Sequence, residues 1–529
     1  MEANTLASRL WARTCGAGKS ILSGSRRGSA LVTVAGATFI IAGLTVVLLT
    51  FTSNALRANN RQQLRAAALH VAESGAEMAV LWLRDQPIPP NIDVVPSIGN
   101  PPTDTAWNVV IYSDADNPNQ FLKMYRIVAT GTVNSTSRTV EIVVKQATFG
   151  KYAYFTDKET SSSGSAIWWN SKDKIDGPVH SNNTSGTNFN IDYSGWSTNN
   201  PLRPIFMDQV TASGTTMNYN PSRPRNEADY QKVFANGSKG YQLGIPKINL
   251  PSSTGIQKEA AWGGTSGFPS TNGVYLRADN EGGVFIRGDA AITMSVDGSG
   301  NQVMTVVQGA NTTVVTYNIN SGTTSVTGPV GSGSPTSAGS FSNGVIYCTG
   351  NITALSGTIA DNKVSGGAIT RPSTWTIATD TNAFKDITVT GDLVYETRPD
   401  KTLDPSAPCN LAAGTLGLVG QDIKIADSGR PNYNHPNREI DAVMLGGSAT
   451  VNGGISVNNY SVGSVGTLKV IGGLIQSTRG AVGTLSGGVI NHGYQKAYHY
   501  DPRLAATPPP FYPTTGQYDR LSWRVMPDN

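Results

Sequence analysis

Three pairs of carboxylates lie close enough in the sequence to act together in acid–base chemistry. They are Asp392 with Glu396, Asp422 with Asp427, and Glu439 with Asp441. Hydrolysis of a glycosidic bond needs two such groups at a defined separation. Each pair, however, falls among residues typical of turns and loops, where aspartate is common. We therefore predict no catalytic residues and a protein that is not an enzyme. A polysaccharide-active enzyme remains as an alternative hypothesis, ranked behind the two given at the end of this subsection.

The most polar phrase without periodicity is DGPVHSN, from Asp176 to Asn182. Asp176, His180 and Asn182 offer a carboxylate, an imidazole and an amide, which together are a candidate binding loop. The alternative is a proline-fixed turn between two strands, in which Asp and Asn cap backbone groups. The sequence favours the turn. Trp168 and Trp169 just before it are either a sugar platform or, as we favour, packing residues.

The cysteines and histidines are not spaced as metal ligands. The three cysteines are Cys15, Cys348 and Cys409, and no CxxC motif occurs. Histidines with a nearby cluster of acidic or cysteine ligands are also absent from the sequence, so we expect no metal and no cofactor. Cys348 and Cys409, which both follow the apolar N-terminal segment described below, are a candidate disulfide. The other interpretation, which we favour, is that Cys348 is a small apolar residue in a strand-like run.

The composition favours short strands over a helical enzyme. Only 14% of the 529 residues are charged, against roughly 25% in average globular proteins. Glycine is abundant at 58 residues, and Ser, Thr and Asn are dense after residue 149. The formal net charge of +4 is small, and no basic run is interleaved with aromatic residues. We therefore expect two or three structural units and no nucleic-acid partner.

An apolar segment near the N-terminus must position everything that follows. No charged residue occurs from Ser29 to Leu56, which is long enough to cross a bilayer as a helix. It is longer than the apolar core of a secretory signal peptide, although Ser53-Asn54-Ala55 resembles a cleavage triplet. Apolar residues then continue with a helical period until Pro87. The pattern predicts one helix over 29–86 with a membrane half and an amphipathic half.

The remainder is predicted to be mainly β. YRIVATGTVNSTSRTVEIVVKQ, residues 125–146, alternates as two strands around a turn, within a hairpin region over 87–150. Residues 151–240 read as irregular β structure and loops. Short apolar runs every 8–15 residues predict a parallel β-helix over 241–500, with a pair of β-sandwiches as the alternative. Residues 501–529 read as a proline-rich tail.

The start of the apolar segment resembles a processing site. RRGSALVTV, with Arg26, Arg27 and Gly28 before Ser29, is similar to the N-terminus of type IV prepilins, and especially of PilX-like minor pilins and GspK-like pseudopilins. The resemblance implies a 1–28 leader that a prepilin peptidase removes after Gly28. The usual glutamate at the fifth mature position is Thr33 here. That departure favours the PilX/GspK-like branch and argues against a repeating major subunit.

Phrases after residue 151 resemble a second family. DGPVHSN, GVIYCTGN, LGLVGQDIKI and YHYDPRL are similar to an uncharacterised bacterial β-rich domain that commonly follows PilX-type N-termini. This resemblance implies that the chain belongs to the same family of domains, but it implies no biochemical activity for the chain.

The resemblances imply a structural and assembly role. The expected protein is a low-copy or tip subunit of a type IV pilus or type II secretion-like filament. Its implied partners are other pilins, the prepilin peptidase, the inner-membrane assembly platform and membrane lipid. It would cross the inner membrane once, with its head outside the cytoplasm. The alternative is a membrane-anchored adhesin or polysaccharide-binding surface protein.

Overall fold

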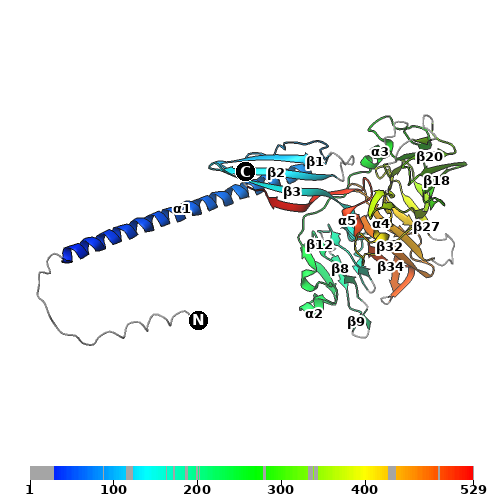
Figure 1. Cartoon of the computed structure of the whole chain (residues 1–529). Helices are drawn as coiled ribbons and strands as arrows, with labels where there is room; N and C mark the ends of the chain where they lie inside the picture. The colour runs from blue at the N-terminus through cyan, green and yellow to red at the C-terminus, as the bar shows by residue number, and fades with distance from the viewer. Residues whose placement is uncertain are drawn as a thin grey trace.

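The computed structural model describes most of the chain as a long N-terminal helix followed by a mainly β body (Figure 1). The described residues are 29–86, 89–114, 123–161, 164–170, 173–184, 189–197, 200–201, 203–277, 282–331, 337–338, 343–426, 436–486 and 489–527. The predicted succession of one long helix and a β-rich remainder is confirmed.

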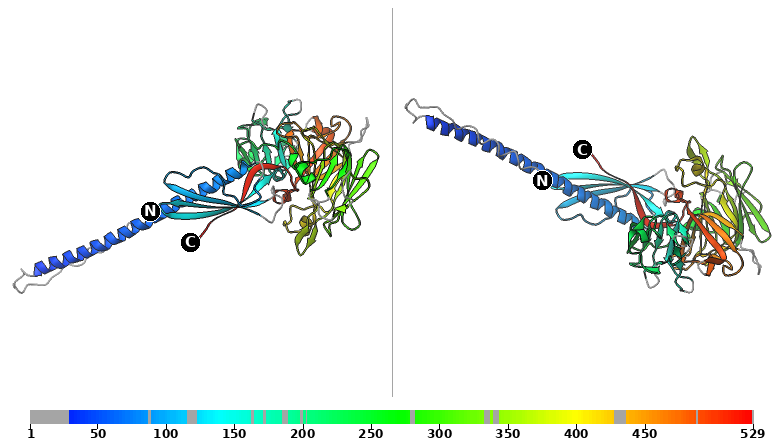
Figure 2. Two further views of the ribbon diagram at one scale, coloured as in Figure 1. Left: turned by 90° about the horizontal axis from the view of Figure 1, so that it is seen from above. Right: turned by 90° about the horizontal axis from the view of Figure 1, so that it is seen from below.

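Helix α1, Ser29–Arg84, is unbroken for 56 residues, or about 84 Å at 1.5 Å per residue. Threonine hydroxyls in its apolar half donate to carbonyls of the preceding turn, as Thr38 does to Val34 O at 2.7 Å, so these polar groups are satisfied within the helix. The helix ends shortly before Pro87, because a proline disfavours helical geometry at the residue that precedes it. In Figure 2 its N-terminal half projects away from the body.

The second half of α1 packs on a four-stranded antiparallel sheet in the order β1-β2-β3-β35. The strands are β1 (Thr105–Ser113), β2 (Met124–Val133), β3 (Thr136–Thr148) and β35 (Thr514–Val525). β2 and β3 form the hairpin expected over 125–146, with Asn134 and Ser135 both at positive φ, as a two-residue hairpin turn requires. Buried Ala68, Ala72 and Ala76 let the helix lie close to the strands.

The last strand of this sheet comes from the far end of the chain. β35 pairs antiparallel with β3, for example Ile142 with Trp523, so residues 149–513 are inserted between two neighbouring strands. The C-terminus therefore lies beside the sheet in Figure 1. This differs from the proline-rich tail expected over 501–529. The segment after the prolines has an alternating pattern suited to an edge strand, with every second residue being Tyr518, Arg520 and Ser522.

The inserted body is built on a ladder of parallel strands. One run comprises β16 (Val284–Arg287), β22 (Val345–Cys348), β26 (Thr374–Thr379), β28 (Thr415–Gly420), β30 (Arg438–Gly446) and β32 (Val465–Thr478). β32 then pairs parallel with β4 (Tyr154–Lys158), followed by β7 (Val179–Ser181), β12 (Val210–Ala212) and β14 (Tyr241–Leu243). The strands from β4 to β14, which come first in the sequence, thus extend the ladder beyond β32.

Further strands lie alongside this ladder. A second parallel run comprises β17 (Ala290–Val296), β23 (Ile352–Ile359), β27 (Ile387–Tyr395), β29 (Ile423–Ile425) and β31 (Ile455–Val457). Shorter parallel pairings join β5 (Trp168–Trp169), β8 (Phe189–Asp192) and β13 (Met217–Asn220), and β6 (Lys174–Ile175) with β11 (Ile205–Phe206). β34 (Val489–Tyr500) pairs parallel with β32.

The sheets are mixed rather than uniformly parallel over 241–500. β17, β18 (Gln302–Gln308), β19 (Asn311–Tyr317), β20 (Thr324–Thr327) and β21 (Ser337–Ala338) pair antiparallel in succession. Tight turns cause the reversal, since Asp297 accepts the Ser299 and Asn301 N–H groups and Gly309 has positive φ. Other antiparallel strands are β9 (Trp196–Ser197), β10 (Asn200–Pro201), β15 (Gly273–Tyr275), β24 (Lys363–Ser365), β25 (Ala368–Arg371) and β33 (Gly483–Ser486).

Short helices and three hydrophobic clusters complete the fold. The helices are α2 (Glu227–Tyr230), α3 (Gly255–Trp262), α4 (Pro408–Ala412) and α5 (Arg503–Ala506), with 3₁₀ turns at Phe149–Lys151 and Gly237–Lys239. One cluster lies between α1 and its sheet, around Ile127 and Ile142. The largest follows the interior of the parallel ladder and includes Ile377, Leu418 and Met444.

Candidate assembly interface and polar sites

The largest exposed apolar surface in the described chain is the N-terminal half of α1. An 18-residue window of this helix has a mean hydropathy of 2.4 and is not buried by any part of the protein. The helix is thus long and apolar enough to cross a membrane. The large exposed residues are Leu31, Val32, Val34, Phe39, Ile40, Ile41, Leu44, Val46, Val47, Leu48, Leu49, Phe51 and Leu56. A patch of this size marks a surface that lipid or other helices cover.

The residues of the predicted processing site stand at the start of this surface. Arg26, Arg27 and Gly28 lie outside the described residues, and Ser29 is the first residue of α1. Thr33 lies one turn further along the exposed helix, where its hydroxyl is 3.4 Å from Ala30 O. A threonine at this position satisfies its own hydroxyl within the helix and brings no charge into the apolar segment.

His180 and Asn182, two of the candidate binding residues, are buried in the body. The His180 Nε2–H donates to Asn182 Oδ1 at 3.0 Å, and Nδ1 lies 2.8 Å from Thr211 Oγ1. Asn182 also donates to Ile248 O at 2.7 Å and accepts the Ile248 N–H at 2.9 Å. The imidazole stacks on Phe155. Burial lowers the pKa of His180 to about 4, so the ring is neutral at physiological pH.

Asp176, the third candidate, binds the C-terminal part of the body. It accepts the Tyr500 N–H at 2.6 Å, forms an ion pair with Lys401, and lies 3.3 Å from His499 Nδ1. Burial raises the pKa of Asp176, but the contacts with His499, Lys401 and Tyr500 outweigh it and bring the pKa to about 2. Gly177 packs against the Tyr500 ring, where a Cβ would come within 2.5 Å. The three candidates therefore do not converge on one open surface.

Cys348 and Cys409 are two free thiols in the structure, not a disulfide. Cys348 lies in β22 and its Sγ–H donates to Gly288 O at 3.1 Å. Burial raises the pKa of this thiol to about 12, so it is protonated and unreactive. Cys409 lies in α4 and is partly buried. Cys348 thus behaves as the small apolar residue that the strand-like run indicated.

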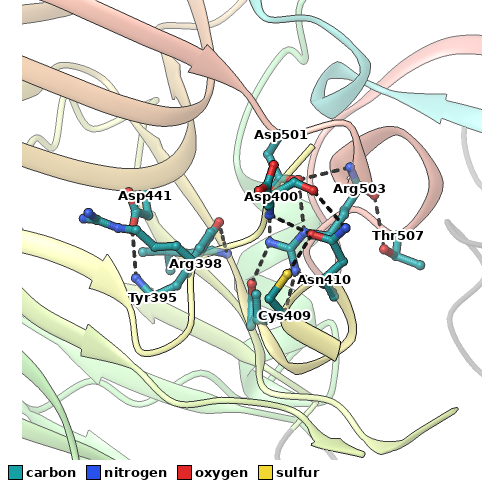
Figure 3. A network of polar contacts seen from close by, with 12 residues as sticks. Tyr395, Arg398, Asp400, Cys409, Asn410, Asp441, Asp501, Arg503 and Thr507 are labelled. Atoms are coloured by element: carbon teal, nitrogen blue, oxygen red, sulfur yellow. Dashed lines mark hydrogen bonds and ion pairs between the residues drawn. The ribbon is translucent and has the colours of Figure 1, made fainter. Parts of the chain in front are cut away.

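The carboxylate pairs are held by cations or backbone groups. Arg398 forms an ion pair with Glu439. It also contacts Asp441 at 2.8 Å, and the Tyr395 N–H donates to Asp441 at 3.0 Å (Figure 3). Burial raises the pKa of Asp441 even beside this guanidinium.

The other two pairs are engaged in the same way. Asp392 lies 3.6 Å from Arg438, Glu396 accepts the Asp361 N–H at 3.1 Å, and Asp422 accepts the Gly454 N–H at 2.9 Å. Asp427 lies outside the described residues. Among the described carboxylates of these pairs, none forms an acid–base couple facing an open cleft.

A second network fastens the C-terminal segment to α4. Arg503 pairs with Asp501 at 2.7 Å and donates to the carbonyls of Ala413 and Gly414 at 2.6 and 3.1 Å (Figure 3). Asn410 donates to Asp400 O at 3.0 Å in the same region. Sequence reasoning did not identify Arg503, because Ala413 and Gly414 lie about 90 positions away from it and such a contact leaves no local pattern.

Sequence reasoning also missed four charged residues inside the ladder. Lys496 Nζ lies 2.8 Å from Asp173 Oδ1, and Arg479 Nη1 lies 2.9 Å from Glu159 Oε2. These side chains come from segments more than 300 residues apart. The aromatic pair Trp168-Trp169 was the only sequence signal near them. Within the described residues, no group of His, Cys, Asp and Glu side chains could hold a metal ion.

Comparisons with known proteins give little on function. A family described as "Domain of unknown function (DUF4900)" matches residues 120–214, which includes DGPVHSN. No curated protein matches the chain. One similar solved structure is the competence-associated pilin ComZ from Thermus thermophilus, with 14% identity, a TM-score of 0.27, and coverage of 88% of this chain and 97% of that chain.

Proposed function

We propose that this chain is a membrane-inserted, prepilin-like subunit of a type IV pilus or type II secretion-like filament. The observation that carries the proposal is the division of α1. One unbroken helix has an exposed apolar half from Ala30 to Leu56 and a second half packed on an antiparallel sheet. A plain anchor needs no such continuity between membrane helix and folded head. Together with RRGSALV, this geometry supports a pilin role.

The proposed mechanism is mechanical. Burying a large apolar side chain is worth roughly 1.5–3 kcal/mol, so the exposed half of α1 is unstable in water. The helix rests in the inner membrane after a prepilin peptidase cuts behind Gly28. The assembly platform then moves it from lipid into the filament, where helices of other pilins cover the same residues. In this arrangement the β-rich body stays outside the cytoplasm throughout.

Thr33 supports a low-copy or tip position. A carboxylate in the apolar segment costs a few kcal/mol in the bilayer unless it finds a partner. Subunits that keep one are expected to use it in docking to a neighbour. Thr33 has no carboxylate and cannot make that contact. A subunit at the filament tip has no subunit ahead of it and does not need the contact. The size of the inserted body, residues 149–513, also favours few copies per filament.

The inserted body would act as a rigid projecting head. We propose that its parallel strands wind as a parallel β-helix, supported by the ladder from β16 through β32 and β4 to β14. In such a coil each turn stacks on the next and buries aliphatic residues in one interior column. The antiparallel strands β17–β21 would form a side elaboration of one turn.

Immunogold labelling with antibodies against residues 149–513 tests the placement. Sparse label at filament ends is the expected result. Regular label along whole filaments would contradict the tip position. Label confined to the cell envelope would instead favour the membrane-anchored adhesin or polysaccharide-binding alternative.

A further inference from the structure

Two ion pairs meet inside the body, where β32 and β34 lie beside the segment from β4 to β6. Lys496 of β34 contacts Asp173, which immediately precedes β6, at 2.8 Å. Arg479, just after β32, contacts Glu159 at 2.9 Å, and its guanidinium lies 4.2 Å from the centre of the Trp169 ring. The walls are aromatic as well as charged, since Tyr154, Trp169 and Tyr498 are all buried.

These groups are withdrawn from water to an unusual degree. The exposed fraction of the side chain is 6% for Asp173, 20% for Lys496, 5% for Arg479 and 0% for Glu159. Burial lowers the pKa of Lys496, and the nearby Arg479 adds to this, although Asp173 opposes the shift. In a poorly solvated site, moving the proton from the ammonium to the carboxylate yields a neutral amine beside a neutral acid. That pair is the reactive form for amide formation.

We propose that Lys496 and Asp173 condense into an intramolecular amide. The neutral Lys496 Nζ attacks Asp173 Cγ, forming the N–C bond. The bond from Cγ to the acid hydroxyl breaks, and the hydroxyl leaves with a proton from nitrogen as one water molecule. No oxidant, reductant or activated co-reactant is consumed. The product is a covalent bridge between β34 and the segment entering β6.

The surrounding residues are suited to stabilise this step. Negative charge develops on the carboxyl oxygen during attack, and Arg479 carries a positive charge close to Asp173. The Trp169 indole N–H is buried and has no hydrogen-bond partner among the described residues, so it is an available donor. Glu159 acts as a positioning residue, because it holds Arg479. A cavity of about 360 Å³, lined by Asp173, Lys496 and Arg479 among others, receives the released water.

Proximity supplies the driving force that separate amine and acid lack in water. Groups held in attacking geometry reach effective molarities of about 10⁵–10⁸ M. Other lysine–aspartate pairs of the described chain do not meet the same conditions. In Lys401 with Asp176 and Lys424 with Asp386, 38% and 36% of the lysine side chain is exposed, so both lysines remain in contact with water. They provide internal controls.

The bridge would join residues 323 positions apart. It would link the first turn of the inserted body to the last long strand before α5. A force applied between α1 and the distal ladder could then not separate these strands. The inference depends on the contacts and burial of these side chains and stands whether or not the chain is a filament subunit.

Peptide mapping of the full-length protein tests the bridge. The protein is extracted in detergent, fully denatured, digested with trypsin and analysed by mass spectrometry. We expect trypsin not to cut after Lys496. The peptide that contains Lys496 should carry the dipeptide Asp173-Lys174 as a branch. The mass of the branched peptide should be one water less than the summed masses of the two separate peptides. Asp173→Asn should give the same branched peptide with loss of one ammonia instead. Lys401→Arg should leave the bridge intact.

Lys496→Arg and Asp173→Ala should abolish the branched peptide. Wild-type protein cut after Lys496, with both peptides at their full separate masses, would overturn the proposal. A branched peptide that persists in Asp173→Ala would overturn it as well. Because the wild-type digest decides the outcome, a variant that misfolds cannot obscure the result.

Discussion

His180 shows how a polar residue that stands out in the sequence takes a structural role. The sequence offers it as a candidate ligand-binding group, and the structure buries it against Phe155 with both ring nitrogens engaged. Asp176 of the same phrase holds the C-terminal segment through Tyr500. The phrase DGPVHSN therefore contacts a distant part of the body through Asp176, which the turn interpretation did not anticipate, and its polar atoms serve the fold.

The buried imidazole predicts a pH dependence of stability. The pKa of His180 is about 4 in the folded state and 6.5 when unfolded, so the unfolded state binds more protons between these values. Its contribution is fully present above pH 6.5 and is lost as the pH falls to 4. At 1.36 kcal/mol per pH unit the loss is about 3 kcal/mol. Denaturant unfolding of the full chain between pH 7 and 4 measures it.

His180→Gln is the matched variant, since it cannot gain a proton in this range. We expect the variant to show a flatter profile than the wild type between pH 6.5 and 4. Asp176 does not contribute to this window, because its pKa of about 2 lies below the ordinary value and its effect is lost only at lower pH. Parallel profiles for the two proteins would contradict the assignment.

At the scale of elements, the contact between α1 and its sheet depends on Gly131 of β2. A Cβ at this position would lie 2.3 Å from Ala72 N and 2.4 Å from Ala68 O. Both are helix backbone atoms, which cannot move aside as a flexible side chain can. The small residues on α1 and the glycine on β2 together set the distance between helix and sheet.

Gly131→Ala should therefore destabilise the helix–sheet unit. Overpacking of this kind costs about 1–3 kcal/mol, and contact with backbone places the effect at the upper end. Gly298→Ala is the control, because no atom lies within 4 Å of its Cβ position. Hydrogen exchange of residues 68–79 should accelerate in Gly131→Ala and not in Gly298→Ala. Equal protection in both variants would show that the close contact is unimportant.

Local signals explain which elements could be predicted from the sequence. α1 and the β2–β3 hairpin have clear periodicity and turn residues within short windows, and both were expected. The antiparallel pair β17–β18 was missed although DGSG between two alternating runs is a turn signal. The pairing of β3 with β35 and the contact of Asp173 with Lys496 leave no local trace. Such long-range contacts are set by packing of the whole body.

At the scale of the whole molecule, a helix-and-sheet unit carries a large insertion. The chain leaves the sheet after β3 and returns at β35, so both connections to the body lie close together. Within the body, the ladder starts at β16 and ends at β14, although β14 precedes β16 in sequence. This arrangement lets the inserted body extend from the sheet while the sheet keeps its place on α1.

The mature N-terminus is the measurement that tests the pilin account most directly. The membrane-extracted protein should begin at Ser29, because a prepilin peptidase is proposed to cut after Gly28. Gly28→Glu should leave an uncut precursor that stays out of filaments, which serves as the control for processing. A mature chain that begins at Leu56 would indicate ordinary secretion, remove the apolar half of α1, and contradict the account.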